Sequence, residues 1–263
     1  MWKKIKVAYR ENDKKLLMVY IILRSLVLIT FVRQIFLREW DNAFLCLLSL
    51  FLFTIPFFIQ EKFEIKIPNG LEIIILCFIF SAEILGEINN FYMHIPEWDT
   101  ILHTINGFLC AGVGFSLIDL LNENSSLIKL SPLFVAIVAF CFSMTIGVIW
   151  EFFEFSMDQF FLTDMQKDRI VRTISTVNLD ITKSNKPIIV KDIEKTILYD
   201  TDNQVLAEFS GYLDVGIIDT MKDLIVNFIG AICFSIFGYL YIHNRDKYKF
   251  VNNFIPKKKL KNN

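Results

Sequence analysis

Six long apolar stretches constrain this chain more than any other feature of its sequence. A helix needs about 20 predominantly apolar residues to cross the hydrocarbon core of a bilayer. The segments of about this length lie near 16–37, 43–60, 71–89, 99–121, 131–158 and 217–242. The chain is 54% hydrophobic, and the excess is gathered in these blocks. The pattern predicts an all-α integral membrane protein, built as a six-helix transmembrane bundle.

Lysine and arginine fix the expected orientation of the bundle, because short loops rich in them stay in the cytoplasm. Both termini are basic, and the connections at 61–70 and 122–130 carry lysines, whereas the connection NNFYMHIPEW has neither Lys nor Arg. We therefore expect a multi-pass protein of the bacterial cytoplasmic (inner) membrane with both termini in the cytoplasm. The segment 159–216 holds seven basic residues yet must face out, which long segments can do regardless of charge.

The segment 159–216 does not resemble another membrane helix. Its stretches RIVRTISTVNLDIT, KPIIVKDIEKTILY and QVLAEFSGYLDV are rich in β-branched residues, and TDN between two of them is typical of a hairpin turn. We expect a small β-rich extracytoplasmic insertion with hairpins. The expected parts are 1–158 with five spans and a cytoplasmic N-terminus, 159–216 with the β-rich loop, and 217–263 with the sixth span and a basic cytoplasmic tail.

Ionisable and amide residues recur at helical spacing at the expected outer ends of three spans. They are Asp99, His103 and Asn106 in the fourth, Glu151, Glu154 and Asp158 in the fifth, and Asp219, Asp223 and Asn227 in the sixth. Residues three and four positions apart share one face of a helix. Ionisable residues within a membrane are costly and mark functional sites. We therefore interpret these three faces as one candidate site.

Simpler explanations stand beside this interpretation. Asp99 and Asp219 lie where helices begin, so either could be an N-cap. Trp150 can mark the membrane interface, which would leave the helix end after it in water. Capping explains one residue per helix, however, and not three on one face. Glu83 and Glu87, at the end of the third span, fit an interfacial helix end.

The residue types of the candidate site suit a hard divalent cation. Carboxylate and amide oxygens are ligands of Mg²⁺, Mn²⁺ or Ca²⁺, and zinc fits less well because no HExxH motif is present. The candidate metal ligands are His103, Glu151, Glu154, Asp219 and Asp223. With Asp99 they are also the candidate catalytic residues. The candidate substrate-binding residues are Arg33, Asn106, Asp158 and Asn227, and Arg33 fits either an interfacial anchor or a phosphate clamp.

Three motifs carry a family resemblance: WDTILHTINGF, then WEFFEF, then DTMKDLIVNFIGA. In order and character they resemble the uncharacterised bacterial inner-membrane family of the YjdF type, over roughly residues 70–160 and 212–240. More distantly they are similar to VanZ-like membrane proteins, which are associated with resistance to glycopeptide antibiotics. The resemblance implies that 159–216 is an insertion, and it brings no settled activity.

Three classes of function stay open. The first is a divalent-metal-dependent enzyme that acts on a lipid-linked or cell-envelope substrate, with the cation as Lewis acid and a carboxylate or His103 as general base. The second is a non-catalytic binder or transporter of a cation, a proton or an amine-bearing ligand. The third is a structural membrane protein whose β-rich loop is the working part. The expected partner is the lipid bilayer, with a lipid headgroup or envelope molecule as substrate. Nothing in the sequence indicates nucleic acid, and it sets no oligomeric state.

Overall fold

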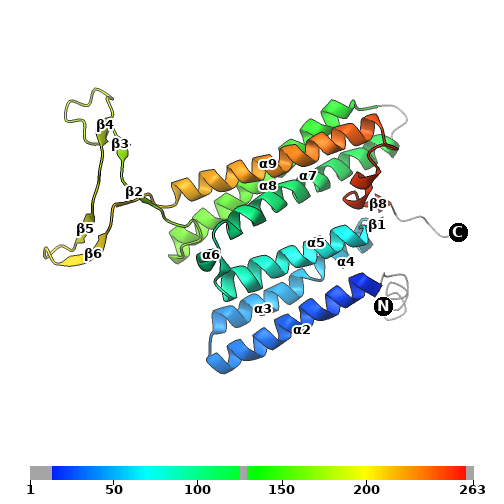
Figure 1. Ribbon diagram of the computed structural model, residues 1–263, viewed down its shortest axis with the longest axis horizontal. Coiled ribbons are helices and arrows are strands. Elements are labelled where there is room, and N and C mark those ends of the chain that lie inside the picture. Colours follow the sequence, from blue (N-terminus) through cyan, green and yellow to red (C-terminus); the bar gives the residue numbers. More distant parts are fainter. Residues whose placement is uncertain (1–13, 125–128, 259–263) are drawn as a thin grey trace. The chain divides into compact units, whose positions relative to one another are not determined.

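The computed structural model describes residues 14–124 and 129–258, and most of them are helical (Figure 1). The basic residues before position 14 and those after Lys258, on which the expected orientation partly rests, lie outside the described residues. The helices are α2 (Lys14–Leu37), α3 (Trp40–Leu52), α4 (Ile55–Lys62), α5 (Asn69–Ile79), η1 (Phe80–Ile88), α6 (Phe91–His94), α7 (Trp98–Asn124), α8 (Pro132–Phe161), α9 (Ile217–His243) and η2 (Lys249–Asn253).

Five helical segments among the described residues are long and apolar enough to cross a membrane. They are Lys14–Leu37, Trp40–Lys62, Trp98–Asn122, Pro132–Phe161 and Ile217–His243. Each matches a predicted span to within a few residues. The segment Trp40–Lys62 is interrupted between α3 and α4, where Pro56 occupies the first turn of α4. Proline is tolerated there because the N–H that it lacks would have no partner within the helix.

The third predicted span, 71–89, is not found as one continuous α-helix. The chain is α-helical from Asn69 to Ile79 in α5 and continues as a π-helix from Phe80 to Ile88 in η1. Hydrogen bonds in a π-helix reach the carbonyl five residues back, and such stretches are rare. The α-helical part has 11 residues, whereas about 20 are needed to cross a membrane. It is too short to span a membrane by itself. The predicted six-helix bundle is observed as five candidate spans and one mixed α/π segment.

The described residues divide into two compact units, one within Met1–Gly147 and Val226–Asn263 and the other within Val148–Ile225. The boundaries between the units fall inside α8 and α9. In the first unit, α2 packs against α3 and α5. An apolar core joins these helices, and its buried members are Leu16, Val27, Cys46, Phe53, Leu76, Ile84 and Ile88. A second core is richer in aromatic residues and joins α7 to the later helices, with Phe115, Phe234 and Tyr241 among its buried members.

Glycines bring α7 and α9 into close contact. A Cβ placed on Gly107 would overlap the backbone of Asn227, and a Cβ on Gly230 would overlap the backbone of Thr104. Small residues of this kind let membrane helices approach through their backbones. Ser143 of α8 donates a hydrogen bond of 2.7 Å to the carbonyl of Gly107. Gly107 of α7 is thus in contact with both α8 and α9.

The second unit contains six short strands in antiparallel pairs, β2 with β7, β3 with β4 and β5 with β6. Their bounds are β2 (Ile170–Val171), β3 (Ile174–Thr176), β4 (Ile188–Val190), β5 (Thr196–Tyr199), β6 (Val205–Phe209) and β7 (Tyr212–Leu213). All six lie in the three stretches predicted to form strands. The TDN turn joins β5 to β6, and the backbone N–H of Asp200 donates to the carbonyl of Gln204 across it. The predicted hairpin is confirmed.

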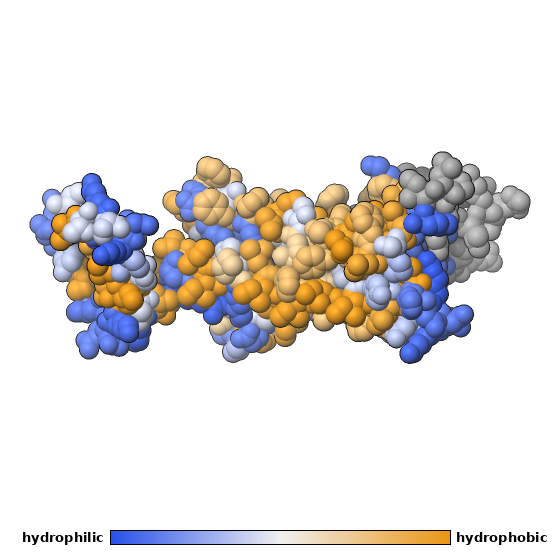
Figure 2. Space-filling view, turned by 90° about the horizontal axis from the view of Figure 1, so that it is seen from above, coloured by the Kyte–Doolittle hydropathy of each residue, from blue (hydrophilic) through white to orange (hydrophobic). Residues whose placement is uncertain are grey.

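Apolar side chains cover the outside of the helices, as the orange surface of Figure 2 shows. Ile29 of α2 and Phe152 of α8, for example, are each 66% exposed. Isolated apolar residues are common on soluble proteins, but continuous apolar coverage of this extent is not. The helices therefore present a surface suited to the hydrocarbon of a bilayer.

Candidate functional site

The start of α7 shows that Asp99 is not a helix cap. The helix begins at Trp98, and the carbonyl of Glu97 accepts the first backbone hydrogen bond, from Ile101. The Glu97 carboxylate also accepts a 2.7 Å hydrogen bond from the Thr100 hydroxyl. Glu97 thus anchors the helix start, while Asp99 projects from the first turn. The capping explanation for Asp99 is wrong.

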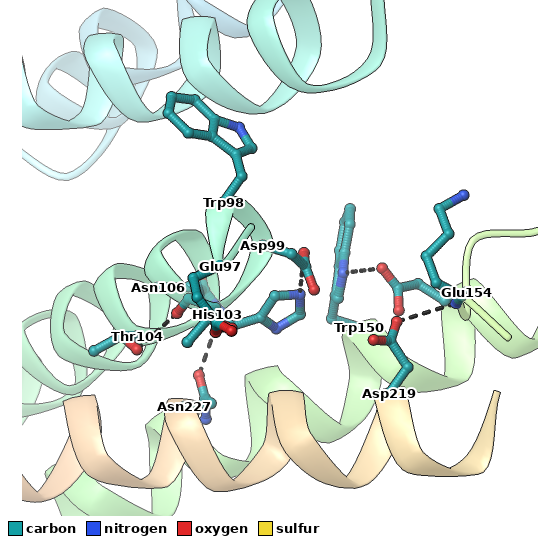
Figure 3. Close-up of polar contacts among 12 residues, drawn as sticks. Glu97, Trp98, Asp99, His103, Thr104, Asn106, Trp150, Glu154, Asp219 and Asn227 are labelled. Carbon is teal, nitrogen blue, oxygen red and sulfur yellow. Dashed lines mark hydrogen bonds and ion pairs between the residues drawn. The ribbon is translucent and has the colours of Figure 1, made fainter. Parts of the chain in front are cut away.

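Asp99 instead contacts His103 one turn further along α7. The Asp99 Oδ1 atom lies 3.4 Å from Nε2 of His103 (Figure 3). His103 is buried, whereas the Asp99 side chain is 36% exposed. A carboxylate beside an imidazole fixes the ring orientation and raises its basicity. The pair predicted from the i, i+4 spacing is confirmed.

Asp223 on α9 completes a group that could hold a metal ion. Ligand atoms of Asp99, His103 and Asp223 all lie within 4.8 Å of one another. Asp223 lies one turn before Asn227 on the unbroken helix α9, so helix geometry fixes its place relative to Asn227. Its side chain is 2% exposed. This group joins residues from two of the three faces that the sequence singled out.

Asn227 lies at a tightly packed point of α9. Its side chain is 1% exposed, and a Cβ on Gly147 of α8 would overlap its amide. Its Oδ1 atom lies 3.5 Å from Nδ2 of Asn106 on α7, a long hydrogen bond (Figure 3). The two predicted amides therefore meet, and they lie one turn deeper along their helices than His103 and Asp223.

In the second unit, Glu151 and Glu154 of α8 are buried, at 4% and 8% exposure. The indole Nε1 of Trp150 donates a 2.8 Å hydrogen bond to Oε1 of Glu154 (Figure 3). Burial of both carboxylates argues against the helix end in water that Trp150 alone would allow. Whether they join the group of Asp99, His103 and Asp223 stays a prediction.

Asp219, buried at 5% exposure, is engaged by residues just after α8. Its Oδ1 atom pairs with Nη2 of Arg169 at 3.1 Å, and its Oδ2 atom accepts the backbone N–H of Lys167 at 3.0 Å. The residue that caps α9 is Asp214, which accepts the backbone N–H groups of Gly216 and Ile218. The capping explanation for Asp219 is therefore wrong too, and its role as a metal ligand stays a prediction.

Two predicted substrate-binding residues have other surroundings. Asp158, near the end of α8, accepts hydrogen bonds from the Thr163 hydroxyl and from the backbone N–H groups of Met165 and Gln166. These contacts shape the chain as it leaves the helix. Arg33 lies exposed on α2. A substrate-binding role for either residue stays a prediction.

Sequence reasoning missed two buried carboxylates in the first unit. Glu72 of α5 is 6% exposed and accepts hydrogen bonds from the Tyr20 hydroxyl at 2.7 Å and from Gln60 at 3.2 Å. Asp119 of α7 is 4% exposed and pairs with Arg245 at 2.8 Å. Each lies near one end of an apolar run and apart from the three faces of ionisable residues that the spacing singled out. Its position inside an apolar run was the signal that could have identified it.

Apolar helices of spanning length with buried ionisable side chains define the class of this protein, an integral multi-pass membrane protein. The chain belongs to the family described as "Predicted membrane protein (DUF2238)", which matches residues 16–244. It is also similar to an "Uncharacterized protein" of Thermotoga maritima, with 27% identity over 104 residues, which is 40% of this chain and 52% of the relative. The chain thus spans about half the length of that curated relative. No solved structure matches the chain.

Proposed function

We propose that this membrane protein binds a divalent cation through Asp99, His103 and Asp223, and uses the cation on a phosphate-bearing lipid-linked or cell-envelope substrate. The convergence of the three ligand atoms within 4.8 Å carries the proposal. Oxygen and nitrogen ligands lie about 2.0–2.6 Å from a bound ion, so two ligands of one ion are at most about 5 Å apart. A single ion therefore fits between these atoms.

Two of the three ligands are carboxylates, which favour Mg²⁺, Mn²⁺ or Ca²⁺, while the single imidazole is the ligand that also suits zinc. Mg²⁺ keeps several waters and binds through few carboxylates, often together with substrate phosphates. Three protein ligands leave coordination positions for such oxygens. The exposed edge of Asp99 supports access to the site from outside the helices. Glu151, Glu154 and Asp219 are proposed as further ligands or as the general base.

The cation would act as a Lewis acid on a phosphoryl oxygen of the substrate. With His103 as a ligand, the general base that accepts a proton from the attacking water would be one of the carboxylates Glu151, Glu154 and Asp219. Asn106 and Asn227 offer amide groups one turn below. With Arg33 and Asp158 they are the proposed substrate-binding residues.

The distribution of Lys and Arg supports a site at the outer face of a bacterial inner membrane, with both termini in the cytoplasm. The finer resemblance to proteins of the YjdF type and to VanZ-like proteins agrees with a role at the cell envelope. In this arrangement the site would lie at the level of lipid headgroups. A lipid phosphate could then reach the cation without leaving the bilayer.

The test uses full-length protein reconstituted in liposomes that contain a lipid phosphate ester, with Mg²⁺ or Mn²⁺ added after chelator treatment. We expect metal-dependent release of phosphate or of the phosphorylated headgroup. The variant Asp223→Asn should lose this release and bind the metal at least about tenfold more weakly, a loss of about 1.4 kcal/mol or more. Glu83→Gln, in η1 at the predicted interfacial end of the third span, is the matched control and should keep both properties.

Two outcomes would contradict the proposal in different ways. Tight metal binding that needs Asp223, without turnover of any lipid phosphate ester, would favour the binder or transporter. Equal metal affinity in the wild type and in Asp223→Asn would overturn the cation site itself.

A further inference from the structure

A second polar site lies at the other end of α7. A cavity of about 330 Å³ is lined by the end of α7, the end of α9 and the chain that follows α9. This volume is at the lower end of the range of small-ligand pockets, about 300–1,000 Å³. The charged side chains of its lining are Asp119, Arg245, Lys257 and Lys258. Asp119 lies 20 positions after Asp99, which is about 30 Å along a helix, so the cavity is distinct from the candidate metal site.

Arg245 is held rigidly in the wall of this cavity. Its Nη2 atom pairs with Asp119 at 2.8 Å, and its Nη1 atom donates to the Tyr241 hydroxyl at 3.2 Å. The hydroxyl in turn donates to Oδ1 of Asn252 at 3.0 Å. The guanidinium carbon also lies 4.9 Å from the centre of the Tyr241 ring. The Arg245 side chain is still 41% exposed, so a fixed guanidinium faces solvent beside a neutralised aspartate.

One lysine of the lining, Lys257, faces another lysine across a two-stranded sheet, and the two positive charges repel each other. Lys257 and Lys258 form the strand β8, which pairs antiparallel with β1 (Ile65–Lys66). Lys66 lies directly opposite Lys257 in this pairing. Like charges directly opposite each other destabilise a sheet, and a sheet of two short strands has little stability to spare. Among the residues that the structure describes, no carboxylate forms an ion pair with any of these three lysines.

A bound anion would remove this cost. An anion in the cavity would offset the repulsion from Lys66, and the lining offers it Arg245, Lys257 and Lys258 against the single, already paired carboxylate of Asp119. A fixed arginine with mobile lysines is a common arrangement for phosphate. We propose that this cavity binds a phosphate group, carried by an anionic lipid headgroup or by a soluble phosphate.

The proposal is tested on the full-length protein in nanodiscs of phosphatidylcholine. The probes are inorganic phosphate, with sodium chloride of equal ionic strength as reference, and phosphatidylglycerol incorporated in the nanodisc. The readouts are the melting temperature and the affinity for each probe. The test variant is Lys257→Gln with Lys258→Gln, and the matched control is Lys191→Gln with Lys195→Gln, which removes the same charge from the strand-bearing segment.

We expect at least one probe to raise the melting temperature of the wild type and of the control, but not of the test variant. Each lysine near a lipid phosphate contributes about fivefold in affinity, so the test variant should bind the probe about 25-fold more weakly. Without any probe, the test variant should melt no lower than the wild type, because it lacks the repulsion between Lys66 and Lys257. This last result separates an anion site from lysines that merely support the fold.

The two probes identify the source of the phosphate. Stabilisation by inorganic phosphate in pure phosphatidylcholine indicates a soluble ligand, whereas stabilisation by phosphatidylglycerol that phosphate does not compete away indicates a lipid headgroup. Either result supports the cavity as a phosphate site. Equal responses of the wild type and the test variant, or no response of the wild type to either probe, would overturn it.

Discussion

Carboxylates in the helices and carboxylates in the strand-bearing segment accept hydrogen bonds from different kinds of donor. Asp180, between β3 and β4, accepts backbone N–H groups from Thr182, Ser184 and Lys186. Asp200 does the same with its neighbours in the β5–β6 turn. In contrast, Glu72 and Asp119 are buried in helices, and they accept hydrogen bonds from side chains far away in the sequence, Tyr20 and Arg245.

The difference follows from where backbone donors are available. In a turn, an aspartate finds unpaired N–H groups two to four residues later. Inside a helix those groups are already bonded, so a buried carboxylate needs side chains or an ion from another element. Asp223 and Glu151, both buried within helices, belong to this second kind by position. A carboxylate in a loop therefore stabilises its own turn, whereas a buried carboxylate in a helix indicates a contact with another element or with a bound ion.

The largest effect should come from breaking the helix contact that holds Asn227 in place. In Gly107→Ala the new Cβ would overlap the backbone of Asn227, so α7 and α9 must separate. Overpacking typically costs about 1–3 kcal/mol and occasionally more, and a clash with backbone atoms places this variant at the upper end of the range. We expect a strongly lowered melting temperature of the purified protein. Gly70→Ala in α5 is the control, because nothing lies within 4 Å of a Cβ there, and it should melt at or slightly above the wild type. Equal melting of both variants would contradict the close contact.

A smaller effect tests the helix carboxylates directly. Glu72→Ala leaves the Tyr20 hydroxyl and the Gln60 amide without their acceptor, and a buried polar group left unpaired costs about 1–3 kcal/mol. Glu72→Gln keeps an acceptor oxygen and should restore most of the loss. Asp200→Ala in the exposed turn should cost less than Glu72→Ala. The measurement is the free energy of unfolding, and a larger loss in Asp200→Ala would reverse the comparison.

The smallest effect concerns pH at the β3–β4 loop. The hydrogen bond from the Thr182 side chain, supported by Ser184 and Lys186, lowers the pKa of Asp180 from 3.8 to about 2. Because the folded-state pKa is the lower one, the stabilisation is present above pH 3.8 and is lost as the pH falls through about 2. Thr182→Val should move the pKa of Asp180 back toward 3.8. Carbon-13 NMR of the carboxyl group measures this, and an unchanged pKa in Thr182→Val would contradict it.

The sequence predicted the elements better than it predicted the site. Apolar length located five candidate spans, and β-branched runs with the TDN turn located the strands, because these signals are local. The π-helical end of the third span was missed, since Phe80–Ile88 carries the same apolar pattern as an α-helix. The spacing of Asp99 and His103 predicted their contact for the same local reason. Which faces meet is a matter of packing, so the partners of Asp119 and Asp219 could not be predicted.

The central claim is that Asp99, His103 and Asp223 hold one divalent cation. Electron paramagnetic resonance of bound Mn²⁺, with nitrogen-15 in the histidines, measures this directly, because a directly bound imidazole couples to the metal. The chain has three histidines, and His94, exposed in α6, provides the control. We expect coupling to a single histidine nitrogen that is lost in His103→Gln and kept in His94→Gln. Coupling that persists in His103→Gln, or bound Mn²⁺ without coupling to any histidine, would contradict the account.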